Sequence, residues 1–259
     1  MLGDAALGAA VAFCLAILTT PVGVSGAVFL VPFQISVVHT PSPAVTPTNL
    51  LFNLIAIPGA LLRFHRERRL GGPLTRLLIL GMLPGVVAGA VIRVFVLDEG
   101  SAFLLVVAAV LVPLGAWLAF AQPPAAPAAS PNPGQRRLIV LLALAVGTIG
   151  GIYGIGGGSI LGPILVSLGF TVVEVAPAAL AATFLTSFAG VATYALLSLG
   201  TSGDIAPEWA LGVGMGVGGM AGAYLGARLQ SRLPEQLLRR GLGLLALALG
   251  LRYAVQALT

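Results

Sequence analysis

Residues 21–32 read Pro-Val-Gly-Val-Ser-Gly-Ala-Val-Phe-Leu-Val-Pro, and residues 152–163 read Ile-Tyr-Gly-Ile-Gly-Gly-Gly-Ser-Ile-Leu-Gly-Pro. Each stretch interrupts a long apolar run with glycine and then continues as a short apolar segment to a proline. The two copies lie 131 residues apart. Because glycine and proline both disfavour a continuous helix, the pattern predicts two broken helices and an internal duplication. In membrane proteins, broken helices at matching positions of two halves point to a transporter's binding site.

The composition is that of a membrane protein. Of the 259 residues, 58% are apolar and 8% are charged, and the mean hydropathy is +1.05. In soluble domains about a quarter of the residues are charged. Four stretches contain no Asp, Glu, Lys or Arg: 5–62, 138–173, 175–203 and 209–227. Because about 20 apolar residues cross a bilayer core, we predict an all-α polytopic membrane protein.

A proline-rich stretch divides the chain. Residues 122–134 carry five prolines and cannot be helical throughout. We therefore predict an N-terminal repeat over 1–121, a Pro/Ala-rich cytoplasmic linker over 122–136 and a C-terminal repeat over 137–259. Each repeat is expected to hold a broken or re-entrant helix pair and three transmembrane helices: 5–40, 47–63, 74–95 and 101–121, then 138–169, 175–199, 207–229 and 234–256.

The arginines predict the orientation. The chain has thirteen arginines and no lysine, and eleven of the arginines fall in 63–76, 136–137 and 228–240. If both broken pairs are hairpins that return to the side they entered, all eleven share one side, which the positive-inside rule makes cytoplasmic. The repeats are then inverted in topology, and both termini lie outside the cytoplasmic (inner) membrane. Were each pair a single kinked span, the basic segments would lie on opposite sides. The net charge of +5 thus reflects topology and requires no nucleic-acid partner.

The breaks suit an anion. A helix that begins inside a membrane leaves its first N–H groups unpaired, and its dipole favours negative charge there. Glycine would let a ligand approach the backbone. The alternative is close helix crossing through small residues. The candidate substrate-binding residues in the breaks are Gly23, Ser25, Gly26, Tyr153, Gly154, Gly156, Gly157, Gly158 and Ser159.

The helix after each break supplies further polar candidates, which are Asn49, Asn53, Thr183, Thr186 and Ser187. Asn49 and Asn53 are spaced i, i+4, as are Thr183 and Ser187, so each pair shares a helix face. These side chains can donate to an oxyanion, or they can serve as hydrogen bonds between helices. Thr19, Thr20, Gln34, Thr46 and Tyr194 are further polar residues near these positions.

The sequence lacks the residue patterns that several kinds of chemistry require. We expect no Asp or Glu in mid-span, since Glu174, Asp98, Glu99, Asp204 and Glu208 fall in the predicted loops, so a carboxylate proton relay is unsupported. The chain has no His-Glu-x-x-His, Walker-type or Ser/His/Asp pattern, and its only cysteine is Cys14. We therefore expect neither an enzyme nor a pump driven by ATP, and no cofactor or metal.

The duplicated unit resembles the TauE/SafE sulfite exporter family, also called the toluene sulfonate uptake permease family. The resemblance rests on the break from Tyr153 to Pro163, the Thr/Ser/Asn helix and a Gly-x-x-x-Gly helix, and it covers about 5–256. The first copy departs from the pattern, with Ser25-Gly26-Ala27 in place of three glycines and with Pro21. The resemblance implies secondary transport of small sulfur-containing or carboxylated anions, such as sulfite, sulfoacetate or other sulfonates. Family members differ in substrate and direction.

Our interpretation is a secondary transporter that moves a small sulfur-containing oxyanion by alternating access. The alternatives are a passive anion channel, a scaffold that transports nothing in a sulfur-metabolism complex, and a cation carrier, whose intramembrane acids are missing. The expected partners are the anion and membrane lipid. Gly212, Gly216 and Gly219 can serve either internal packing or a homodimer.

Overall fold

The structure is a computed structural model that describes residues 2–22, 24–66, 70–97, 101–121, 133–200, 205–229, 232 and 234–258. The first half holds α1 (Leu2–Thr19), α2 (Ala27–Phe33), α3 (Ser42–Arg66), α4 (Pro73–Phe95) and α5 (Ser101–Phe120). The second holds α6 (Pro133–Tyr153), α7 (Gly158–Ser167), α8 (Val172–Ser198), α9 (Trp209–Leu229) and α10 (Glu235–Leu258). Among the described residues, eight helices are long and apolar enough to cross a membrane. The prediction of an all-α multi-pass protein is confirmed.

The two short helices follow the breaks. Helix α2 continues as a π-helical turn over Gln34–Val38, and α7 ends at Ser167. Pro32 and Pro163 lie inside these helices and do not end them. Each proline is five residues beyond its helix start, so it removes one i→i−4 hydrogen bond while the chain continues.

Three predicted boundaries differ from the structure. Helix α3 begins at Ser42 and not at 47, because Pro43 in its first turn lacks an N–H that would be unpaired there anyway. Helix α6 begins at Pro133, so 133–136 belong to the helix and not to the linker. The rest of the predicted linker, 122–132, lies outside the described residues. Glu174 is not in a loop: it forms a capping box with Thr171 in the first turn of α8.

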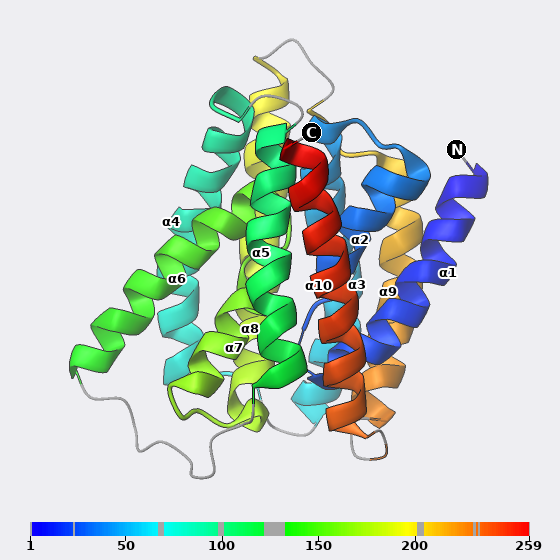
Figure 1. The fold of residues 1–259 in the computed structure, drawn as a ribbon. Coiled ribbons are helices and arrows are strands. Elements are labelled where there is room, and N and C mark those ends of the chain that lie inside the picture. Colours follow the sequence, from blue (N-terminus) through cyan, green and yellow to red (C-terminus); the bar gives the residue numbers. More distant parts are fainter. Residues whose placement is uncertain are drawn as a thin grey trace.

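The contacts between helices come in corresponding pairs. Helix α4 packs along α6, and α9 packs along α1. Helix α4 also contacts α8, and its counterpart α9 contacts α3. Helices α5 and α10 contact each other, and so do α3 and α8; in both of these pairs the two helices are each other's counterparts. Each contact therefore has a counterpart with the halves exchanged. In Figure 1, α1 and α6 run in opposite directions, and the N and C labels lie at the same end of the molecule.

Glycines set the closest of these contacts. A Cβ on Gly85 or Gly89 of α4 would meet backbone of α6, at Leu144 O and Thr148 O. The counterparts on α9, Gly218 and Gly222, would likewise meet the α1 carbonyls of Ala9 and Phe13. The absence of side chains lets the helix backbones approach closely.

A second glycine face of α9 lies against α3. A Cβ on Gly212 would meet Leu51, one on Gly216 would meet Ile55, and one on Gly219 would meet Phe52. The sequence left two roles open for these glycines, internal packing or a homodimer, and internal packing accounts for this face.

Candidate functional site

The two breaks meet inside the molecule. The Ser25 N–H donates to Ser159 Oγ at 2.9 Å, which joins the first break to the start of α7. Ser25 Oγ donates to Asn53 Oδ1 at 2.8 Å and accepts from the Ala27 N–H at 3.2 Å. Ser25, Asn53 and Ser159 are all buried. These three predicted residues, one of them from the second half, therefore form one connected polar centre.

The second break depends on left-handed backbone. Gly154, Gly156 and Gly157 have φ of 87°, 68° and 90°, a conformation that costs other residues about 1–2 kcal/mol. Helix α8 holds this loop. Thr186 Oγ1 donates to Gly156 O at 3.1 Å, and the Gly158 N–H donates to Thr183 Oγ1 at 3.2 Å. The first break is different, because Gly26 has an ordinary φ of −56°.

Asn49 ties the two breaks together. Its Nδ2 donates to Ala27 O at 2.9 Å and to Gly154 O at 3.1 Å, while Gln34 Nε2 donates to its Oδ1 at 3.4 Å. Thr46 Oγ1 donates to Ile152 O at 2.9 Å. Gln34 and Thr46, which the sequence indicates as further polar residues beside the candidates, thus join this network. The shared face of Asn49 and Thr46, three residues apart on α3, is the signal that groups them.

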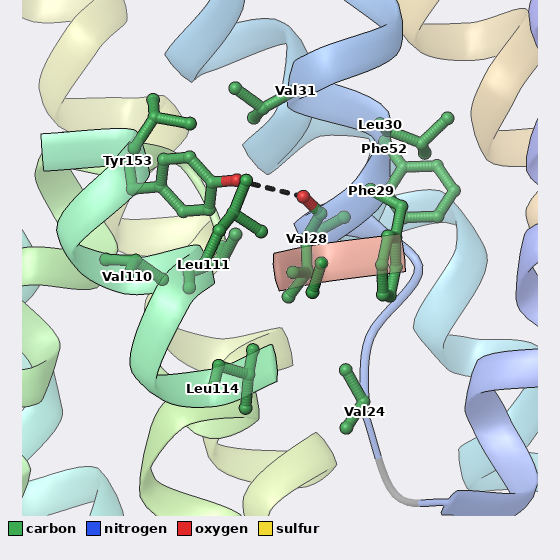
Figure 2. Packing of buried hydrophobic residues seen from close by; sticks show 14 of the residues in the cluster. Val24, Val28, Phe29, Leu30, Val31, Phe52, Val110, Leu111, Leu114 and Tyr153 are labelled. Atoms are coloured by element: carbon green, nitrogen blue, oxygen red, sulfur yellow. Dashed lines mark hydrogen bonds between the residues drawn. The ribbon is translucent and has the colours of Figure 1, made fainter. Parts of the chain in front are cut away.

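Tyr153 completes a hydrogen bond that a proline leaves open. Pro32 has no N–H, so Val28 O loses its partner in α2. The Tyr153 hydroxyl donates to this carbonyl at 2.9 Å (Figure 2). The ring lies among apolar residues that include Val110 and Leu111 of α5. Tyr153 therefore fastens the end of α6 to α2, and its hydroxyl is already in use.

Polar atoms without a partner are found at the breaks. Among the described residues, the buried side-chain atoms with no hydrogen-bond partner include Asn53 Nδ2, Ser187 Oγ, Thr19 Oγ1 and the acceptor Gln34 Oε1, and each of these residues is 0% exposed. Such a group costs about 1–3 kcal/mol. Asn53 and Ser187 are 134 positions apart, as are Asn49 and Thr183. Each half therefore holds one buried polar atom without a partner at the equivalent position of its helix, and such a group in a native structure needs an explanation.

The glycines of the second break do not face open space. A Cβ on Gly156 would lie 2.7 Å from Thr183 Cγ2, one on Gly154 would lie 2.7 Å from Thr46 O, and one on Gly158 would meet Thr183 Oγ1. Helices α3 and α8 thus fill the space that our prediction reserved for an anion. In this conformation these glycines are closely packed, as the alternative of close helix crossing expects.

A small cavity lies beside the first break. A cavity of about 20 Å³ is bordered by Ser25 and Gly26, and a volume of this size holds about one water molecule. A larger hollow of about 400 Å³ borders Arg76 and Arg136 at the starts of α4 and α6, and no break residue lines it. Gly23, also predicted for the site, lies outside the described residues.

Charged residues of the described segments lie away from the breaks. Arg93 donates to Leu97 O at 2.9 Å, and its guanidinium stacks over the Phe103 ring at 4.3 Å. Asp4 and Glu174 lie in the first turns of their helices, and Glu208 precedes α9. Within these segments, no three His, Cys, Asp or Glu side chains are grouped to hold a metal. The centre therefore offers neutral donors.

No curated protein and no solved structure matches the chain. A family model described as sulfite exporter TauE/SafE matches residues 8–253, nearly the whole chain. The chain therefore belongs to the TauE/SafE sulfite exporter family.

Proposed function

We propose that this protein is a secondary transporter that moves a small sulfur-containing oxyanion, such as sulfite, sulfoacetate or another sulfonate, by alternating access. Family membership supports a membrane transporter of small anions. The observation that carries the site is the pair of buried, unpartnered donors at Asn53 and Ser187, one from each half. Two donors from opposite halves suit a ligand whose oxygens point in several directions.

The anion would replace hydrogen bonds that the protein now makes with itself. The Ser25 N–H is held by Ser159 Oγ, and the Gly158 N–H by Thr183 Oγ1. In our proposal these two hydroxyls rotate away, so that the anion accepts hydrogen bonds from both N–H groups at the positive ends of α2 and α7. Neutral donors would bind an anion without the strength of a buried arginine and so allow release.

Rocking of one half against the other would open the site to each side in turn. The corresponding contacts of α4 on α6 and of α9 on α1 support two inverted repeats, over 1–121 and 137–259. The positive-inside rule supports a position in the cytoplasmic membrane with the arginine-rich loops inside and both termini outside.

Thermal stability of the purified protein tests the binding site. We expect sulfite or a sulfonate to raise the melting temperature saturably, because a ligand that binds only the folded state stabilises it. Ser187→Ala should weaken this shift without lowering the stability of the free protein, since the hydroxyl has no protein partner. Ser198→Ala is the matched control on α8. Ser198 is the last residue of this helix, and its Oγ donates to Ala195 O within the helix.

Flux in proteoliposomes separates the mechanisms. A carrier saturates and exchanges labelled for unlabelled anion, whereas a passive channel does neither. A protein that neither binds nor moves any anion of a panel of sulfite, thiosulfate, sulfoacetate, taurine and simple carboxylates would contradict the proposal and favour a scaffold.

A further inference from the structure

The cavity beside Ser25 has a counterpart position in the other half. Asn49 and Asn53 on α3 correspond to Thr183 and Ser187 on α8, both 134 positions later, and Gly85 on α4 corresponds to Gly218 on α9, 133 positions later. The cavity is bordered on α3 by Ala56 and Ala60, and by Leu180 and Ala223. The same spacing gives their counterparts, in the same order, as Gly190, Tyr194, Thr46 and Ala90.

One of these counterparts is a tyrosine, and its ring fills the space between the others. Tyr194 is 0% exposed and packs in a cluster with Ala90 and Leu50. Its hydroxyl donates to Gly151 O at 3.0 Å. Gly151 is the counterpart of Thr20, which borders the cavity. The phenol ring thus occupies the position that the small Ala60 side chain leaves open in the other half.

The two positions lie toward opposite ends of the molecule. Ala60 is on the part of α3 that leads to Arg66, and Tyr194 is one turn from the end of α8 at Ser198. Figure 1 shows the end of α8 at the same end of the molecule as the chain termini. Ala60 follows Asn53 by seven residues and Tyr194 follows Ser187 by seven, so each lies on the same helix face as its donor, two turns along.

We propose that Tyr194 closes the path from the two breaks to the end that carries the termini, and that the cavity at Ala60 begins the path to the arginine-rich end. The inference rests on the proposed transport function. Tyr194 then determines from which side the donor centre is reached. The ring must leave its place between α8 and α6 before an anion enters or leaves past it.

Thiol labelling tests this closure without any substrate. In a Cys14→Ser background, Ser187→Cys places a thiol just inside the ring, and a membrane-impermeant thiosulfonate is applied to sealed vesicles of either orientation. We expect labelling from the terminal side to be slow with Tyr194 present and to rise about tenfold with Tyr194→Ala, as the accessible population rises by that factor. Tyr194→Phe keeps the ring and should stay slow.

The other path has the converse test. Asn53→Cys should be labelled from the arginine-rich side, and Ala60→Val should slow that labelling about tenfold, since two added methyl groups then fill a space that holds about one water molecule. Melting temperatures and elution as a single species identify variants that fail to fold.

The proposal would be overturned if the Ser187→Cys thiol were labelled from the terminal side at the same rate with and without the Tyr194 ring. A thiol that stays unreactive when the ring is removed would also overturn it. If labelling follows the expectation but no anion binds, the path stands and the proposed substrate class fails. If an anion binds and Tyr194→Ala changes nothing, the transport function stands and the closure fails.

Discussion

The N-terminal residues of the two short helices differ in backbone conformation although they occupy the same position. Gly26 precedes α2 with φ −56°, and Gly157 precedes α7 with φ 90°. A Cβ on Gly26 would lie 3.6 Å from the nearest atom, Phe52 Cζ, which is ordinary contact. On Gly157 it would lie 3.0 Å from Val146 O. Only the second break therefore requires glycine at this position.

Alanine at these two positions gives a matched comparison. Gly157→Ala should lower the free energy of unfolding by about 1–2 kcal/mol, because an L-residue is strained at that φ. Gly26→Ala should change it by less than about 0.5 kcal/mol. Denaturation of both variants in the same detergent measures the difference, and an equal loss in the two would show that left-handed backbone is not what Gly157 supplies.

At the scale of the element, the closest helix pairs depend on glycine at every fourth position. Gly214, Gly218 and Gly222 of α9 lie over Ala5, Ala9 and Phe13 of α1. This spacing keeps the glycines on one face of the helix. On α4, Gly81, Gly85 and Gly89 lie over α6 in the same way. Because α1 and α6 each lead into a break, these contacts also hold the breaks in place.

A larger residue should force such a pair apart. Gly218→Leu is expected to destabilise the protein by about 1–3 kcal/mol or to prevent folding, as overpacking does. Gly85→Leu on α4 should have a similar effect, because Gly85 lies against α6 as Gly218 lies against α1. Gly241 on α10 has no atom within 4 Å of an added Cβ, so Gly241→Ala should stabilise by up to about 1 kcal/mol. Stability of Gly218→Leu equal to that of the parent would contradict the close-packing argument.

At the scale of the whole molecule, both termini lie at one end and the exposed arginines Arg66, Arg76 and Arg136 begin or end helices at the other (Figure 1). The positive-inside rule predicts that the arginine end is cytoplasmic, as we propose above. We expect a protease site inserted in the linker, 122–132, to be cut only from the cytoplasmic side. Tags on the two ends should be reached only from outside. Tags found on opposite sides of the membrane would contradict two hairpins.

The amino-acid sequence by itself determined the helices and the two breaks, and it predicted the duplication. These depend on properties read along the chain: the length of apolar runs, glycine and proline in them, and repeated spacing. It also pointed to Asn53 and Ser187, because their spacing from Asn49 and Thr183 puts them on shared helix faces.

The tertiary structure alone decided which of these polar groups are used. Asn49 and Thr183 have hydrogen-bond partners, whereas Asn53 Nδ2 and Ser187 Oγ have none, and nothing in the local pattern separates them. It also packed the second-break glycines against α3 and α8, and it placed Tyr194 at the position equivalent to Ala60, which borders a cavity in the other half. The physical reason is that hydrogen-bond partners and free volume arise between residues more than a hundred positions apart, as in the bond from Ser25 to Ser159.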